Sequence, residues 1–376
     1  MAYRSLLALG ALDAAGYSLI VPVLPEIAGA TGSGPATLGL LVASFPAGMI
    51  AGFWLGGRIV RRYGVGPLIP AALALIALGA LGFVLTESLA VYFVSRVVMG
   101  LGSAGLWLGV TFDTIARWPG QEYVCMSRIL AAYSIGGLAG PALGAVGGIA
   151  APFTLYLALV MAAFLLLFAL HPAPGGAGLG SDPAVLRARG FRVAALAGMF
   201  TYLVLGLMEG TLPLHLADRL GQAEIGVLFV GLALVVAAGA AGAGSRRPRS
   251  MVLGSVVLAV TGISLAGAVS SVPLWTVALG LAALGVGIGG TGAFGLLVEA
   301  VDVDRIVTAL VVFSQAGIAG YLLGPLIGGL AAEGLGYAAV GLVPAVFGAG
   351  LLAAMIAGPT PIQASTSGQV RPSRTS

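Results

Sequence analysis

The sequence predicts an all-α integral membrane protein, with twelve transmembrane helices arranged in two pseudo-symmetric six-helix bundles. Three observations lead to this prediction. The 376 residues are 59% hydrophobic and only 8% charged, whereas about a quarter of the residues of a soluble domain are charged. Apolar runs of about 20 residues, long enough to cross a hydrocarbon core of about 30 Å, follow one another along the chain. Finally, a glycine–proline motif occurs twice.

The apolar runs are interrupted only by short breaks that contain Pro, Gly or Arg. We expect helices near residues 5–25, 36–57, 67–86, 88–110, 127–149, 151–170, 192–213, 223–244, 250–270, 273–298, 306–331 and 336–357. The boundaries at 86–88 and 149–152 are the weakest, which leaves ten or eleven helices as an alternative. Strands are not expected, because the runs lack period-2 alternation and are too long for barrel strands.

The first run also has features of a signal peptide. Arg4, the apolar stretch and Ala28-Gly29-Ala30 resemble its three regions. Asp13 within the run argues against this alternative, and the five further helices of the first half need a sixth partner. We therefore expect the run to be the first transmembrane helix.

The repeated motif divides the chain into two halves. Both copies read G-x-x-x-G-P-x-x-G and fall in the fifth helix of a half, as Gly136, Gly140, Pro141 and Gly144 and again as Gly320, Gly324, Pro325 and Gly328. The one long polar break, residues 171–191, separates them. We expect an N-terminal bundle over 1–170, a cytoplasmic linker over 171–191, a C-terminal bundle over 192–357 and a disordered cytoplasmic tail over 358–376.

The arginines predict the orientation. All basic residues are Arg, and 15 of the 17 fall in segments on one side of the predicted membrane. Cytoplasmic segments carry an excess of positive charge, so both termini are expected in the cytoplasm. The outer loops carry mainly acids, namely Glu26, Glu87, Asp218, Glu224 and Glu333. A fringe of arginine along the membrane also argues against a nucleic-acid partner.

Three motifs resemble one known family. "LDAAGYSLIVPVLPEI" is similar to the first helix of tetracycline exporters, and "RVVMGLG", with Arg96, matches the R-x-x-x-G-x-G of helix 4. "GLAGPALG" after Gly136 matches the antiporter motif of helix 5. Over residues 3 to about 357 the chain resembles the major facilitator superfamily, and within it the twelve-helix drug:proton antiporters. The resemblance implies the major facilitator fold and alternating access to a site at the midplane.

The loop between helices 2 and 3 departs from the family pattern. "GGRIVRRYGVG" stands where the family has G-x-x-x-D-R-x-G-R-R, and Arg61 takes the place of the Asp. In the family this loop holds the cytoplasmic side closed in one state. We expect a cytoplasmic charge latch in which Arg58 or Arg62 pairs with Asp113. In the second half, Arg246 or Arg247 would pair with Glu299. Ordinary interfacial pairing is the alternative, because exposed ion pairs contribute only about 0–1 kcal/mol.

Buried charges are the candidates for coupling. A charge at the membrane centre costs at least about 2.5–3.5 kcal/mol, so Asp13 must be neutral, paired or hydrated. Helix geometry puts Asp13 about 12 Å and Arg96 about 18 Å from the inner face, within reach of an arginine side chain. We expect the two to pair and Asp13 to carry the coupled proton. The alternative is a fixed structural bond.

A second buried acid, Glu209, is expected nearer the outside, where it could bind a cationic substrate or a second proton. Alternatively, Glu209 is a solvated residue at a wide opening on the outer side. Apolar walls with few polar groups suit partly hydrophobic ligands. The candidates for such a wall are Tyr17, Tyr133, Phe200, Tyr202, Phe313, Gln315 and Tyr321. For each of them, core packing or contact with lipid is the alternative.

Other chemistry is not predicted. The two G-x-G-x-x-G matches, at 100–105 and 285–290, lie inside apolar helices rather than after a strand, as a dinucleotide site requires. There is no P-loop and no nucleophile elbow. His171 and His215 do not form a metal motif with any carboxylate. We therefore expect neither an enzyme nor a cofactor or metal.

These features together predict a monomeric exporter in a bacterial inner membrane. It would use the inward proton gradient to expel a small hydrophobic or cationic compound. A sugar or metabolite transporter of the same fold is the main alternative, although few polar residues are available for a sugar. A non-transporting membrane sensor is a further alternative. The absence of a soluble sensing domain argues against it.

Overall fold

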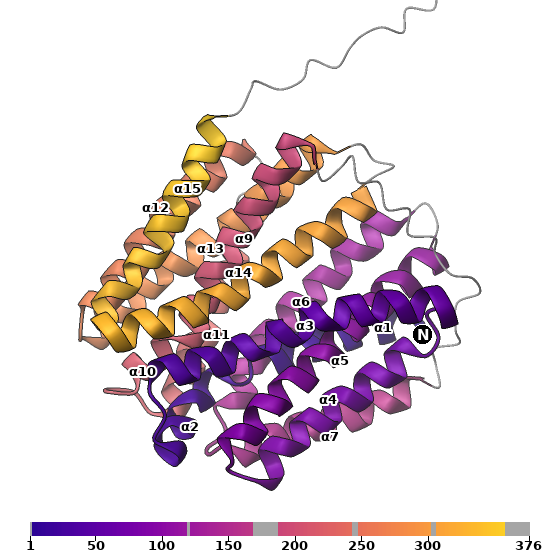
Figure 1. Ribbon diagram of the computed structural model, residues 1–376, viewed down its shortest axis with the longest axis horizontal. Helices are drawn as coiled ribbons and strands as arrows, with labels where there is room; N and C mark the ends of the chain where they lie inside the picture. The colour runs from indigo at the N-terminus through magenta and orange to yellow at the C-terminus, as the bar shows by residue number, and fades with distance from the viewer. Residues whose placement is uncertain (1, 119–120, 168–186, 243–246, 302–305, 358–376) are drawn as a thin grey trace, which may run out of the picture.

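The computed structural model describes residues 2–118, 121–167, 187–242, 247–301 and 306–357. Within these ranges the chain is helical and forms α1 (Ala2–Ser18), η1 (Val21–Val23), α2 (Leu24–Thr31), α3 (Pro35–Tyr63), α4 (Leu68–Leu85), α5 (Leu89–Arg117), α6 (Glu122–Gly144), α7 (Ala150–Leu166), α9 (Arg189–Gly210), α10 (Leu212–Leu216), α11 (Gln222–Gly242), α12 (Pro248–Ala268), α13 (Val272–Ala300), α14 (Ile306–Leu335), η4 (Tyr337–Gly341) and α15 (Leu342–Ile356). Figure 1 shows them as one bundle of long, roughly antiparallel helices.

The predicted fold class is confirmed, because helix occupies the place of every predicted apolar run. Ten stretches of the described chain are long and apolar enough to cross a membrane, and α7 supplies a shorter apolar helix. The first crossing is interrupted by η1, and α10 continues the crossing that α9 begins. The weak boundary at 86–88 is a true break, because α4 ends before it. The break between α6 and α7 lies at 145–149, earlier than the predicted 149–152, where α7 has already begun.

Four helices are longer than the sequence predicts, and one of them is α14, whose 30 residues reach Leu335 instead of 331. α3, α5 and α13 each have 29 residues and continue past the end of their apolar run. In α3 the added turns carry Arg58, Arg61 and Arg62, which the hydropathy pattern assigns to a loop. The helix ends at Gly64, whose φ of 77° lies in the left-handed region that favours glycine.

Successive helices alternate in direction, so the bundle has two ends. One, here called the arginine-rich end, carries the beginning of α1 and α9 and the end of α3 and α5. The other, here called the α10 end, carries α2, α10 and the connections at 86–88, 145–149 and 269–271. In Figure 1 the α10 end lies at the lower left.

Buried side chains gather in two large cores. One is built almost entirely from residues before 164, and the other from residues after 190. Tyr321 joins the first core and Val21 the second, so each half contributes a side chain to the other. The halves meet where α3 packs on α14 and α6 packs on α11. Large apolar side chains are exposed on the outer surface, for example Leu165 and Val227, as expected for a surface that faces lipid.

The two glycine stripes pack inside their own halves. A Cβ atom at Gly136 or Gly140 would overlap α1 at Ala11 and Ser18, and one at Gly320 would overlap α9 at Met199. Small residues allow such close approach of transmembrane helices. Pro141 has no N–H for the carbonyl of Gly137, which accepts a hydrogen bond from the Ser18 hydroxyl at 3.2 Å instead.

The backbone carbonyls of the prolines in the same motif face the opposite half, whereas the ring of Pro325 packs on Gly206 and Gly210 of its own half. The carbonyl oxygen of Pro325 lies against Gly39 of α3, and that of Pro141 lies against Gly226 of α11. Gly39 and Gly226 are in the second helix of their halves, so the two contacts are related by the pseudo-symmetry. Each repeated motif therefore packs its glycines within its own half and presents the carbonyl of its proline to the other half.

Candidate functional site

Asp13 lies on α1 with 2% of its surface exposed, and it accepts a hydrogen bond from the Ser103 hydroxyl of α5 at 3.0 Å. The Tyr156 hydroxyl of α7 packs against Gly16, one turn along α1. None of the ion pairs among the described residues joins Asp13 to Arg96. The expected Asp13–Arg96 pair is therefore absent from this structure, and Ser103 is the partner of the carboxylate.

Arg96 is fully buried on α5, with its guanidinium carbon 4.4 Å from the centre of the Phe45 ring. None of its three nitrogens has a hydrogen-bond partner among the described residues. Electrostatic interactions with Glu209, Tyr17 and Tyr321 reach it from both halves. A buried guanidinium is satisfied only by acceptors, so this side chain is available to a ligand or to a carboxylate that approaches in another state.

Tyr17 and Tyr321 connect the halves beside Arg96. Their ring centres are 4.4 Å apart, and Tyr17 also makes an edge contact with Phe45 at 5.6 Å. The Tyr321 hydroxyl donates to Glu209 at 2.6 Å, and Glu209 is 8% exposed. The structure thus brings together three residues predicted separately, namely Tyr17, Tyr321 and Glu209. The solvated outer mouth considered for Glu209 is not its environment here.

The other predicted wall residues are spread more widely. Tyr133 is half-buried and meets Trp107 edge-on at 5.0 Å. Tyr202 is 43% exposed beside Gly317, Phe313 packs against Gly198, and Gln315 is exposed. Phe200 lies apart from these predicted wall residues. It is 3% exposed in the core of the second half and faces Gly348 of α15.

The expected cytoplasmic charge latch is not formed in this structure. Asp113 binds Arg117, one turn along its own helix, at 2.5 Å. Arg58 stacks on Trp54 at 3.2 Å and Arg62 lies over Tyr63. In the second half, Arg247 and Glu299 are exposed and take part in no ion pair among the described residues, and Arg246 lies outside them.

The halves are fastened together at the α10 end. Gln222, at the start of α11, donates from Nε2 to the carbonyls of Gly144 at 2.8 Å, Val146 at 3.3 Å and Gly148 at 2.9 Å. Its Oε1 accepts from the Gly148 N–H at 2.8 Å. Glu333 of α14 accepts from the Ala36 N–H at 2.9 Å. Both sets of hydrogen bonds join the halves at the α10 end and hold the bundle closed there.

We predict that Gln222→Ala favours opening at this end. Each lost hydrogen bond contributes about 1 kcal/mol net, so the equilibrium should shift at least about tenfold. Spin labels on cysteines at Gly29 and Ala217, in a Cys125→Ser background, would report a longer separation. The control is Glu224→Ala, two residues away, whose carboxylate bonds only Gly221 of its own half. Equal distance distributions in Gln222→Ala and Glu224→Ala would show that the Gln222 hydrogen bonds do not hold this end closed.

Several site residues carry no sequence motif. Ser103, Tyr156 and Gln222 are polar residues within or beside apolar runs, and only the folded chain shows their partners. One signal was available for the inter-half glycines: Gly39 and Gly226 occupy corresponding places in the second helix of each half. A search for internal symmetry beyond the proline motif would have found this pair.

The chain is similar to a known family and to a curated relative. The family model described as Major Facilitator Superfamily matches residues 6–245. The curated protein "Multidrug resistance protein 2" of Bacillus subtilis (strain 168) is 28% identical over 130 residues, which make up 34% of this chain and 32% of that protein. The chain therefore matches about a third of that relative's length.

Solved structures match the chain along almost its whole length. A D-xylose-proton symporter has a TM-score of 0.76 at 15% identity, covering 94% of this chain and 96% of that one. A bacterial homolog of the human lysosomal transporter Spinster, inward-facing and unoccupied, has a TM-score of 0.74 at 15% identity over 94% and 90%. The nucleoside transporter NupG has a TM-score of 0.72 at 14% identity over 95% and 99%. Likeness at this identity shows the fold alone.

Proposed function

Because the chain belongs to the Major Facilitator Superfamily, we propose that it is a proton-coupled exporter of a small hydrophobic or cationic compound. The two halves would rock about a central site that includes Asp13, Arg96, Glu209, Tyr17 and Tyr321. The partial match to a protein named for multidrug resistance supports this cargo class. Closure at the α10 end supports a state that is open toward the arginine-rich end.

One observation carries the coupling proposal: two buried carboxylates are held by hydroxyl groups. Asp13 is bonded to Ser103, and Glu209 to Tyr321, while neither forms an ion pair with Arg96. Such a carboxylate can take up or release a proton without first breaking an ion pair. Arg96 can then move toward whichever carboxylate is charged, because opposite charges attract strongly where water is excluded. Cargo and proton would thereby compete for one set of groups.

The experiment is transport by the purified wild-type protein in liposomes. With an imposed pH gradient, we expect uphill movement of an aromatic or lipophilic cation and proton movement in the opposite direction. Sugars and nucleosides belong in the same panel, because the main alternative is a metabolite transporter. Uphill movement of a sugar, with no effect of hydrophobic cations, would replace the proposed cargo class. A resistance screen of expressing cells would narrow the choice of compound.

We further propose that the arginine-rich end faces the cytoplasm of a bacterial inner membrane, with both termini on that side. A cysteine at Ser181, in the 171–191 linker, should then resist a membrane-impermeant maleimide in intact cells. A cysteine at Ser271, in the connection between α12 and α13, should react readily. Both variants need the Cys125→Ser background. The reverse labelling pattern would invert the proposed orientation.

Glu209 is proposed to bind the cationic part of the cargo. We predict that Glu209→Gln weakens transport of cationic compounds about tenfold or more, because a charge-assisted bond is replaced by a neutral one. Neutral compounds of similar shape should be affected less than about threefold. The control, Tyr321→Phe, removes the hydroxyl that holds Glu209 and keeps the carboxylate. Equal losses for charged and neutral cargo in Glu209→Gln would assign the residue to proton transfer or to packing.

A further inference from the structure

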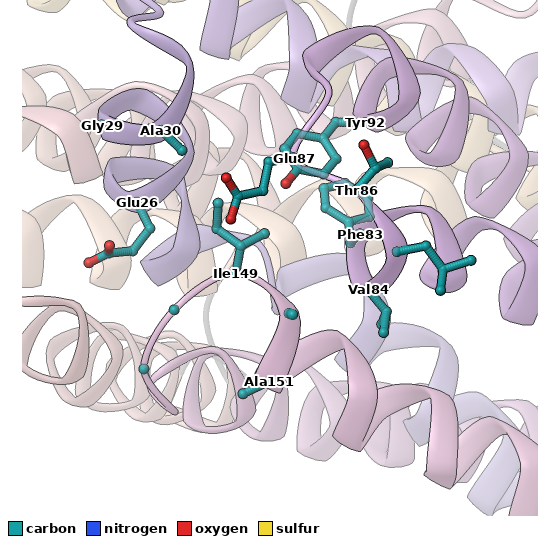
Figure 2. Close-up of a pocket in the computed structure, with 14 residues that line it drawn as sticks. Glu26, Gly29, Ala30, Phe83, Val84, Thr86, Glu87, Tyr92, Ile149 and Ala151 are labelled. Atoms are coloured by element: carbon teal, nitrogen blue, oxygen red, sulfur yellow. The ribbon is translucent and has the colours of Figure 1, made fainter.

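A cavity lies at the α10 end of the first half, lined by residues other than those of the central site. Its volume is about 600 Å³, within the range of sites for small molecules. Its walls come from α2, the end of α4, the beginning of α5 and the connection between α6 and α7. Figure 2 shows the lining side chains, with Glu87 near the middle between Tyr92 and Ile149.

The charged residues that line the cavity are all acidic. Glu26 and Glu87 are among the lining residues, and no lining residue is basic. Figure 2 shows Glu26 across the cavity from Tyr92, with its carboxylate directed away from Glu87. Glu87 is therefore the acid placed to contact a ligand, and Glu26 adds negative potential at the rim. Both carboxylates are exposed, which leaves Glu87 free to be reached by a ligand.

Tyr92 supplies a second, independent observation. Its side chain is fully buried and lines the cavity, but its hydroxyl has no hydrogen-bond partner in the described part of the chain. A buried hydroxyl without a partner costs about 1–3 kcal/mol. Figure 2 shows this hydroxyl on the side where Glu87 lies, and the two groups interact electrostatically. A donor placed between them would satisfy both oxygens.

The apolar wall favours a particular kind of donor. Tyr92 stacks on Phe83 with ring centres 4.6 Å apart, and Phe83 stacks on Phe153 at 3.9 Å. These buried, stacked rings form a rigid apolar wall against which an apolar group of a ligand can pack. We propose that this cavity binds a primary ammonium ion with an apolar body, its N–H groups donating to Glu87 and to the Tyr92 hydroxyl. The ammonium can come from a free amine or from an ethanolamine lipid headgroup.

The site also shares a wall with the closure between the halves. Gly147 and Gly148 line the cavity, and Gly148 makes two of the hydrogen bonds to Gln222. A ligand that orders the connection between α6 and α7 should favour the closed arrangement that the Gln222 hydrogen bonds stabilise. By reciprocal linkage, the Gln222→Ala variant should bind the amine more weakly than the wild type does.

The test measures binding of 2-phenylethylammonium to the purified full-length protein in a non-ionic detergent. We expect saturable binding that Glu87→Gln weakens at least about tenfold and that the neutral 2-phenylethanol does not reproduce. Tyr92→Phe should bind about threefold more weakly or worse. Its thermal stability without ligand should be equal to or above that of wild type, because the unpartnered hydroxyl is gone. Glu224→Gln, an acid of the α10 end outside the cavity, is the matched control.

A second arm distinguishes the two sources of the ammonium. Wild type and Glu87→Gln are purified from membranes containing phosphatidylethanolamine, and the retained lipid is identified by native mass spectrometry. Retention by wild type alone, with displacement by the amine, assigns the site to the headgroup. Saturable amine binding without retained lipid assigns it to a free amine. If Glu87→Gln binds the amine as wild type does, or if wild type binds neither amine nor lipid, the proposal is wrong.

Discussion

Asp13→Asn is expected to abolish uphill export while exchange of substrate across the membrane survives. Asparagine keeps the size of the side chain and can still accept from the Ser103 hydroxyl, which is 3.0 Å from the carboxylate. It cannot take up or release a proton. The halves should still alternate around bound cargo, but the proton gradient would no longer drive them.

The measurement compares wild type and Asp13→Asn in liposomes, with an imposed pH gradient for uphill transport and with equal pH for exchange. Ser103→Ala is the matched control, because it removes the hydrogen bond and keeps the acid. It should retain coupled transport, although at a lower rate. If Asp13→Asn still pumps uphill, Asp13 is structural, and Glu209 becomes the candidate for the coupled proton.

The second large effect is expected from the glycine stripes. Gly140→Leu and Gly324→Leu should prevent accumulation of folded protein. Overpacking of a well-packed core costs about 1–3 kcal/mol and occasionally more. Here the added side chains would overlap backbone atoms, of Ala15 in α1 and of Leu203 in α9. The overlap lies inside each half, so the cost falls on folding itself.

Size-exclusion profiles of fluorescently tagged variants would measure this effect. The chain offers a control on each helix, since a Cβ at Gly137 of α6 or at Gly334 of α14 meets no atom within 4 Å. Leucine at these two positions should leave the profile unchanged. A different result, with folded Gly140→Leu protein that binds cargo but does not transport it, would indicate that the stripe slides during the cycle. Full transport activity in Gly140→Leu and Gly324→Leu would exclude both the packing and the sliding interpretation.

The helical fold could be predicted because apolar length is a local property of the chain. Each apolar run had to become a helix, since lipid leaves backbone groups no other partners. The ends of helices were less predictable. The last turns of α3 carry Arg58, Arg61 and Arg62, and nothing in their hydropathy distinguishes a helix that projects from the membrane from a loop.

Pairing within the site was predictable only in part. Helix geometry placed Asp13 within reach of Arg96, but Ser103 is two turns from Arg96 on the same helix, about 10 Å along its axis. Asp13 therefore lies between Arg96 and Ser103 in depth. The packing of α1 on α5 brings its carboxylate to Ser103 rather than to Arg96. Tyr17 and Tyr321 could be named separately because both are polar aromatic residues in apolar helices. Their contact depends on how α1 of one half lies against α14 of the other, which a single sequence does not contain.

The clamp made by Gln222 has a consequence for the response to membrane voltage. Its bonds to the 144–148 connection use an amide, which carries no net charge, so breaking them moves no charge through the electric field. One elementary charge crossing the whole field corresponds to about 2.3 kcal/mol per 100 mV. Glu333, the charged group at the same closure, is exposed at the end of its helix. Any voltage dependence of opening should therefore arise from Asp13, Arg96 and Glu209 and from the proposed protons and cationic cargo, and Gln222→Ala should change opening without changing its gating charge.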